Sequence, residues 1–141
     1  MIVLAGRNLA KMEAAKAELD ELGVESCLCK TDIADRAQVQ ALADYAASLG
    51  DVTQVIHTSG VSPSDTATEN IIKINAAGTV NMVETFYPVL AEGGVMINFS
   101  SVAAYTMPQT DEWTQSFEAW DAPDFYDRML ALAGEAGGDE E

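Results

Sequence analysis

The sequence predicts an α/β protein, a doubly wound parallel sheet with helices on both faces in three layers. Three observations predict this fold class. The 141 residues are 48% hydrophobic and 21% charged, as in one ordinary globular domain or a large piece of one. Short apolar segments alternate along the chain with longer segments of helical spacing. Such alternation is typical of right-handed crossovers between parallel strands.

The first strand and helix are expected at 2–5 and 9–22. The opening residues form an apolar run that ends at Gly6, which is typical of a buried strand. Asn8 is a residue type that caps helix N-termini, and Gly23 stands where a helix commonly ends. Residues typical of helix ends therefore stand on both sides of the predicted helix.

Three further strands are expected to alternate with two further helices. The strands are predicted at 24–29, 52–57 and 95–99. Asp35 is expected to cap a helix over 35–49 that Gly50 ends. A longer helical pattern covers 66–90, and Pro88 is expected to bend or end it.

The composition changes after Tyr105. Acidic and aromatic residues dominate 106–134, and their spacing predicts two short amphipathic helices joined at Ala122 and Pro123. The segment 135–141 is expected to be a disordered tail. The chain is thus expected to comprise a partial nucleotide-binding domain at 1–105, a helical insertion at 106–134 and the tail.

The charge balance excludes several function classes. Seven basic residues face 23 acidic ones, a formal net charge of −16, so no nucleic-acid footprint and no attraction to an anionic membrane are expected. No apolar run approaches the ~18–20 residues of a membrane helix. No secretion signal opens the chain, and two cysteines make no disulfide framework, so a cytoplasmic setting is expected. One histidine and two cysteines predict no metal site.

Polar or small residues follow all four expected strands. In parallel α/β sheets, ligands bind beyond the carboxyl ends of the strands. Here those ends carry Gly6-Arg7, Thr31-Asp32, His57 to Gly60, and Ser100-Ser101. The sequence therefore predicts a ligand site at this edge of the sheet.

Five segments, in order and spacing, resemble the short-chain dehydrogenase/reductase family, a Rossmann-type group of nicotinamide-dependent oxidoreductases. They are VLAGRN at 3–8, TDIAD at 31–35, VIHTSG at 55–60, KINAAGTV at 73–80 and INFSSVAA at 97–104. The resemblance covers about residues 1–105. It implies a sheet in which strand 2–5 lies beside 24–29, and 52–57 beside 95–99, with one strand's place open between the pairs.

Two parts of the family pattern are not found in this sequence. The family begins with a strand and a TGxxxGxG loop, and its active-site tyrosine and lysine form a YxxxK motif. No lysine follows Lys73 here, and Tyr105 and Tyr126 have no lysine four residues on. The resemblance thus implies an internal fragment that is inactive alone. Residues 107–134 resemble an insertion that some family members carry between serine and tyrosine.

The resemblance implies cofactor-binding roles for residues at three strand ends. Gly6 leaves room for a 2′-phosphate and Arg7 can grip it, which favours NADP over NAD. Asp32 would accept the adenine amino group, and Ile33 would pack on the ring. Thr58, Ser59 and Gly60 are the remaining expected cofactor contacts. Their small size would let the backbone approach the nucleotide.

It also implies two catalytic residues. Ser101 would hydrogen-bond the substrate carbonyl, and Asn75 would hold a water in the proton relay to the lysine. Each residue has a plainer alternative: Arg7 a solvated cation, Asp32 a helix cap, Asn75 a polar residue inside a helix, Ser101 a turn residue. His57, the one histidine, is expected to be structural.

The expected function is hydride transfer between NADP(H), or less favourably NAD(H), and a small carbonyl or alcohol substrate. The alternative is a non-catalytic nucleotide-binding or protein-interaction module, since the tyrosine and lysine are not in the sequence. The helix at 66–90 resembles one that pairs subunits in many family members. A homo-oligomer and burial of this helix inside one chain are both compatible with its pattern.

Overall fold

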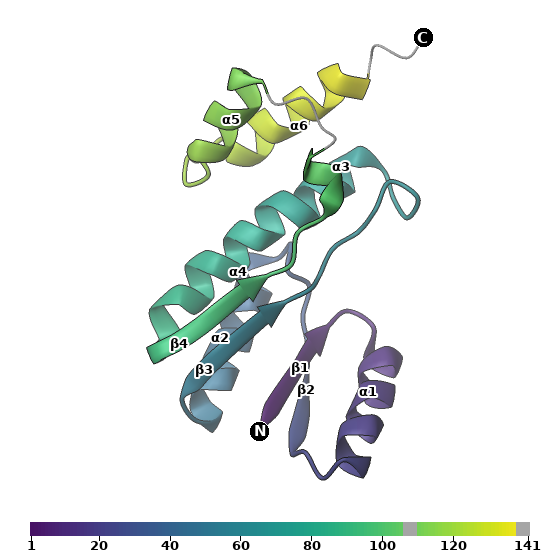
Figure 1. Ribbon diagram of the computed structural model, residues 1–141, viewed down its shortest axis with the longest axis vertical. Helices are drawn as coiled ribbons and strands as arrows, with labels where there is room; N and C mark the ends of the chain where they lie inside the picture. Colours follow the sequence, from purple (N-terminus) through teal and green to yellow (C-terminus); the bar gives the residue numbers. More distant parts are fainter. Residues whose placement is uncertain (106–109, 138–141) are drawn as a thin grey trace.

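The computed structural model describes residues 1–105 and 110–137 (Figure 1). In chain order the elements are β1 (Ile2–Gly6), α1 (Leu9–Glu21), β2 (Ser26–Lys30), α2 (Arg36–Leu49), β3 (Val52–His57), α3 (Thr68–Ile71), a π-helical segment (Ile72–Ala77), α4 (Gly78–Phe86), a 3₁₀ turn (Tyr87–Val89), β4 (Leu90–Asn98), a second 3₁₀ turn (Val102–Tyr105), α5 (Asp111–Glu118) and α6 (Phe125–Gly137). The alternation of strands and helices confirms the predicted α/β class.

The four strands form two separate parallel pairs, as predicted. β1 pairs with β2, with Ile2 opposite Ser26 and Gly6 opposite Lys30. β3 pairs with β4, with His57 opposite Asn98. Among the described residues no backbone ladder joins one pair to the other. β1 and β3 therefore each present one edge without a strand neighbour.

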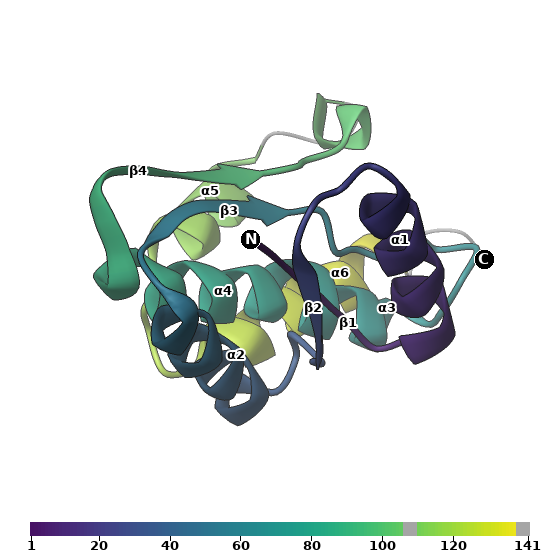
Figure 2. The ribbon, with the colours of Figure 1, turned by 90° about the horizontal axis from the view of Figure 1, so that it is seen from below.

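The helices cover the two strand pairs unequally. α1 contacts β1 and β2, whereas α2 packs against α4, and α4 contacts β3. Figure 2 shows α1 beside the β1–β2 pair and α2 and α4 together beneath β3 and β4. The opposite face of the β3–β4 pair is exposed, with large apolar side chains at Ile56, Val95, Ile97 and Phe99. We call these four residues the open sheet face.

The predicted helix signals are confirmed at both ends of α1 and α2. Asn8 Oδ1 accepts the backbone N–H of Lys11 at 3.0 Å, and Asp35 Oδ1 accepts that of Ala37 at 2.9 Å. Gly23 follows α1 with a φ of 70°, a left-handed conformation that glycine adopts without steric cost. Local chemistry therefore sets where these helices begin and end.

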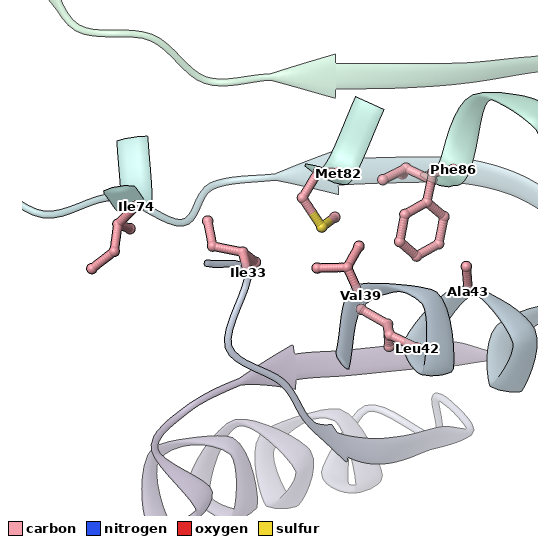
Figure 3. Close-up of a cluster of buried hydrophobic side chains, with 8 residues drawn as sticks. Ile33, Val39, Leu42, Ala43, Ile74, Met82 and Phe86 are labelled. Carbon is pink, nitrogen blue, oxygen red and sulfur yellow. The ribbon is translucent and has the colours of Figure 1, made fainter. Parts of the chain in front are cut away.

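One hydrophobic cluster joins the two strand pairs through α2. Its buried side chains come from β3, the turn after β2, α2, the π-helical segment and α4, and most of them appear in Figure 3. They are Ile33, Val39, Leu42, Ala43, Val55, Ile74, Met82 and Phe86. Val3 and Cys29 of the other pair pack against the cluster. An ion pair between Arg36 and Glu84 also links α2 to α4.

The helix predicted at 66–90 contains a π-helical segment and ends before residue 90. The N–H of Gly78 donates to the carbonyl of Lys73, five residues back, so Ile72–Ala77 is wound more widely than an α-helix. The helix ends at Phe86, and Pro88 lies in the 3₁₀ turn that follows. The predicted end or bend at Pro88 is therefore confirmed, whereas the π-helical segment is not part of the prediction.

The last strand begins earlier than the predicted 95–99. β4 starts at Leu90 and contains Gly93-Gly94, a dipeptide that is typical of turns. Gly93 has a φ of 75°, and a Cβ on Gly94 would lie 2.9 Å from the carbonyl oxygen of Ala91. The register shifts at this point, so the glycines form a bulge within the strand.

The two helices predicted after Tyr105 are present as α5 and α6. α6 packs against α3 and the π-helical segment. Arg128 Nη2 donates to the carbonyl of Ala119 at 2.8 Å, which ties α6 to the end of α5. α6 runs to Gly137, into the segment predicted as a tail, and positions 106–109 and 138–141 lie outside the described residues.

Within the described ranges, 1–105 and 110–137, none of the helices has the length and apolar character required to cross a membrane.

Candidate cofactor and catalytic site

A cavity of about 380 Å³ lies where β1 and β2 end. Arg7 follows β1 and Asp32 follows β2, and both line this cavity. Most of the other residues that line the cavity come from the loop after β3 and from the helical segment that follows this loop. These residues are Val61, Asp65, Thr66, Asn70, Lys73 and Ile74. The structure thus places a cavity at the sheet edge where the sequence predicts a ligand site.

Asp32 is held by the turn that leads into α2. Its Oδ1 accepts the N–H of Ala34 at 3.0 Å, while its own N–H donates to Gln38 Oε1 at 2.9 Å. Asp35 provides the helix cap, so the capping alternative for Asp32 is not needed. A carboxylate accepts several hydrogen bonds, which leaves Asp32 capacity for a ligand amino group.

The pKa of Asp35 is lowered. Hydrogen bonds from the side chain and backbone of Gln38 are the main causes, and the positive charge of Lys73 contributes less. Because Asp35 is an exposed cap next to the cavity, it stays ionised at neutral pH and keeps the start of α2 fixed beside Asp32.

Ile33 lies in the core and is not one of the residues lining this cavity. A Cβ on Gly78 would lie 2.9 Å from the Cδ1 of Ile33, so the side chain fills the space above that glycine. Apolar contact in the cavity comes instead from Ala34, Val61 and Ile74. The packing of Ile33 on the adenine ring therefore stays a prediction. The position of Ile33 in the core does not favour it.

Asn75 clamps the loop that follows β3. Its Oδ1 accepts the N–H of Val61 at 2.9 Å, and its Nδ2 donates to the carbonyl of Val61 at 2.8 Å. A Cβ on Gly60 would stand 3.5 Å from the same Oδ1. Thr58 and Ser59 are exposed beside it. The structure therefore brings Asn75 and the predicted 58–60 segment together.

His57 is buried, 4% exposed, at the end of β3 and reaches Asn75 through Thr79. The Thr79 hydroxyl donates to the carbonyl oxygen of Asn75 at 2.7 Å, which uses its one hydrogen. His57 Nε2, 3.2 Å from Thr79 Oγ1, must therefore be the donor. This geometry assigns the neutral tautomer protonated on Nε2 and supports the structural role predicted for His57.

Burial lowers the pKa of His57 below its ordinary value of 6.5. Between that lowered pKa and 6.5 the unfolded chain binds more protons than the folded one, so stability is expected to fall as pH drops through this window. His57→Gln, whose amide can also donate to Thr79, should remove that loss. Urea unfolding at pH 7.5, 6.5 and 5.5 measures it. Equal pH dependence in both proteins would contradict the assignment.

Ser101 is exposed at the end of β4. Its Oγ accepts the N–H of Ala103 at 3.2 Å, which corresponds to the turn role named as its alternative. The hydroxyl hydrogen can still donate to a substrate carbonyl. Ser101 is not among the described residues that line the cavity with Arg7, Asp32 and Lys73.

Lys73 is the basic residue of the cavity that the sequence does not single out. It lies in the π-helical segment and shares the cavity with Arg7. Two of the seven basic residues of a strongly acidic chain thus line one small space. Its position two residues before Asn75 was the available signal. The wider helical turn that accompanies it has no sequence signature.

A family model described as short chain dehydrogenase matches residues 1–113. Among curated proteins, a short-chain dehydrogenase/reductase of Alternaria brassicicola is 29% identical over 108 residues, 77% of this chain and 39% of that protein. A human carbonyl reductase whose name specifies NADPH is 27% identical over 109 residues, 72% of this chain and again 39% of the relative. The chain thus spans about two fifths of the length of these relatives.

Solved structures show the same fold. A short-chain dehydrogenase/reductase from Burkholderia phymatum, determined in complex with NAD, superposes with a TM-score of 0.66 at 22% identity, covering 96% of this chain and 48% of that one. A structure described as a putative short-chain dehydrogenase from Novosphingobium aromaticivorans gives a TM-score of 0.66 at 21% identity over 96% of this chain and 51% of the other. At these identities the likeness concerns the fold.

Proposed function

The chain belongs to the short-chain dehydrogenase family, and from that premise we propose that it forms the cofactor-binding part of an oxidoreductase that transfers hydride between NADP(H) and a small carbonyl or alcohol. The observation that carries the proposal is the cavity at the strand ends, where Arg7, Lys73 and Asp32 meet. Two cations suit a phosphate group, and a carboxylate suits an amino group. The named relative that uses NADPH supports the same cofactor.

The residues present fit the adenosine end of such a cofactor. Arg7 lines the cavity and offers a planar, permanently charged guanidinium that can bind a phosphate through two hydrogen bonds. Gly6 would leave room for the 2′-phosphate, but it is not among the described residues that line the cavity, and a Cβ there would lie 3.5 Å from Met12 Sδ of α1. Asp32 would accept the adenine amino group. Thr58, Ser59 and Gly60 would let the backbone approach the ribose and pyrophosphate.

When bound, the nicotinamide supplies or accepts the hydride. The chain's own residues would orient the substrate and hold the relay. Ser101 would donate its hydroxyl hydrogen to the carbonyl oxygen, where negative charge develops. Asn75, with its backbone carbonyl fixed by Thr79, would hold a water of the proton relay.

Arg7→Ala is expected to weaken NADPH binding about 10- to 100-fold, because a charge-assisted contact of about 1.5–3 kcal/mol is removed. NADH binding should barely change, since NADH has no 2′-phosphate. Calorimetric titration of each variant with NADPH and NADH measures the difference. 2′,5′-ADP and 5′-AMP repeat the comparison with the adenosine end alone.

Arg36→Ala removes the same charge outside the cavity, where Arg36 pairs with Glu84, and serves as the matched control. It should leave the preference for NADPH unchanged. Equal losses for NADPH and NADH in Arg7→Ala would mean that Arg7 is structural, and the proposed cofactor preference would be wrong.

The second candidate is a nucleotide-binding or interaction module without catalysis. The observation that favours it is that no lysine follows Lys73, so residues 1–141 do not contain the family's YxxxK motif. We propose that residues 1–105 are the nucleotide-binding unit and 106–134 a helical insertion, in a cytoplasmic protein. Purified 1–141 should then bind NADPH without oxidising it against a panel of carbonyl compounds.

A further inference from the structure

A second cavity, of about 740 Å³, lies between the α5–α6 pair and the helical segment that precedes α4. One wall comes from α3 and the π-helical segment, with Ile71, Ile72 and Ala76. The other wall comes from α5 and α6, with Trp113, Phe117 and Met129. Its volume falls within the range of small-molecule sites in proteins, roughly 300–1,000 Å³. It shares only Thr66 with the described lining of the cofactor cavity.

The walls favour a flat apolar ligand. Trp113 and Phe117 stack with ring centroids 6.0 Å apart and ring planes inclined by 28°. Phe117 is 52% exposed although it faces a cavity lined mostly by apolar groups. A ligand ring packed against these two side chains would remove apolar surface from water and gain aromatic contacts.

The negative charge of the surrounding residues narrows the class of ligand further. α5 carries Asp111, Glu112 and Glu118, α3 carries Glu69, and the whole chain has a formal net charge of −16. These carboxylates would repel an anionic ligand. None of the described residues that line the cavity carries a charge that could pair with a buried cation. The cavity is therefore suited to a neutral molecule.

Asn75 provides a directional polar group in this cavity. Its Oδ1 and one hydrogen of Nδ2 hold Val61, and the amide has a second Nδ2 hydrogen. We propose that the cavity binds a neutral aromatic small molecule that presents one hydrogen-bond acceptor, such as a ketone oxygen, to this hydrogen. The site shares Asn75 with the proposed proton relay, but none of its contacts with the ligand requires a bound nucleotide.

The fluorescent ketone 6-propionyl-2-dimethylaminonaphthalene (prodan) is a suitable probe, because it is neutral, flat and has one carbonyl acceptor. Trp113 and Trp120 are the two tryptophans of the chain, and only Trp113 lines the cavity. In a Trp120→Phe background, prodan titrated without any nicotinamide nucleotide should quench Trp113 emission saturably, and its own emission should shift to the blue.

A pair of substitutions on α6 tests the location. Ala133→Phe fills the cavity from one wall, whereas Ala131→Phe adds the same group at an exposed position. The first should weaken prodan binding about tenfold or more, and the second should leave it unchanged. Ala76→Leu fills the cavity from the opposite wall and replaces Ala133→Phe if circular dichroism shows that variant to be unfolded.

The open sheet face is the competing apolar surface, and Ile97→Gln tests it. Binding that survives Ile97→Gln and is lost in the cavity-filling variants supports the proposal. Binding that survives the filled cavity, that is lost in Ile97→Gln, or that never saturates in the Trp120→Phe protein overturns it. Because no nucleotide is present, failure here leaves the cofactor proposal untouched, and failure of the Arg7 comparison leaves this one untouched.

Discussion

Ser101→Ala is expected to lower carbonyl turnover by about 10²–10³-fold, the effect of removing one donor to a developing oxyanion. The assay requires a protein in which the family's tyrosine and lysine are present. Cofactor affinity should stay nearly unchanged, because the hydroxyl is proposed to face the substrate carbonyl. Steady-state rates together with NADPH titration separate the two quantities.

Alanine also removes the acceptor that holds the N–H of Ala103, so two further variants are needed. Ser101→Thr keeps a hydroxyl for both contacts and should restore much of the rate. Ser100→Ala should be mild, because the proposal gives the neighbouring hydroxyl of Ser100 no contact with the substrate carbonyl. Turnover that survives Ser101→Ala would show that the chemistry lies elsewhere in the protein.

Phe86→Ala is expected to destabilise the folded chain by about 3–5 kcal/mol, the usual loss when a buried phenylalanine leaves a cavity. Phe86 is 4% exposed in the cluster that joins α2 and α4. A small domain has only about 5–15 kcal/mol of stability, so this loss should remove a large part of the free energy of unfolding and clearly lower the urea midpoint. Urea titration followed by far-ultraviolet circular dichroism measures the change.

Tyr87→Ala is the matched control, because Tyr87 is the next residue and is 75% exposed. It should cost well under 1 kcal/mol, as surface substitutions usually do. A loss in Phe86→Ala no larger than that in Tyr87→Ala would mean that the α2–α4 contact does not hold the fold together, and the arrangement of the core would be wrong.

The elements that the sequence predicts best are those whose signals are local. Asn8 and Asp35 cap their helices as expected, and Gly23 ends α1, because capping depends on neighbouring backbone groups only. The strand pairing is confirmed as well. It rests on the family resemblance and not on periodicity, since two apolar segments do not by themselves specify which strand lies beside which.

The parts that the sequence does not predict depend on contacts between distant residues. The π-helical segment, the start of β4 at Leu90 and the position of Lys73 beside Arg7 all follow from how helices and loops pack. Ile33 illustrates the difficulty, because its neighbour Asp32 lines the cavity while Ile33 itself turns into the core over Gly78. Which side of a turn faces a ligand is decided by tertiary packing.

The division of the strands into two unconnected pairs affects how cooperatively the molecule unfolds. In a continuous sheet, backbone hydrogen bonds carry cooperativity from strand to strand. In the described residues the two strand pairs are joined by side chains, because Val3 and Cys29 pack against the hydrophobic cluster that contains Val39, Leu42 and Ala43 of α2. The two pairs are therefore expected to open as separate cooperative units, each with its own free energy of opening. α2 is then the helix expected to couple the opening of one unit to that of the other.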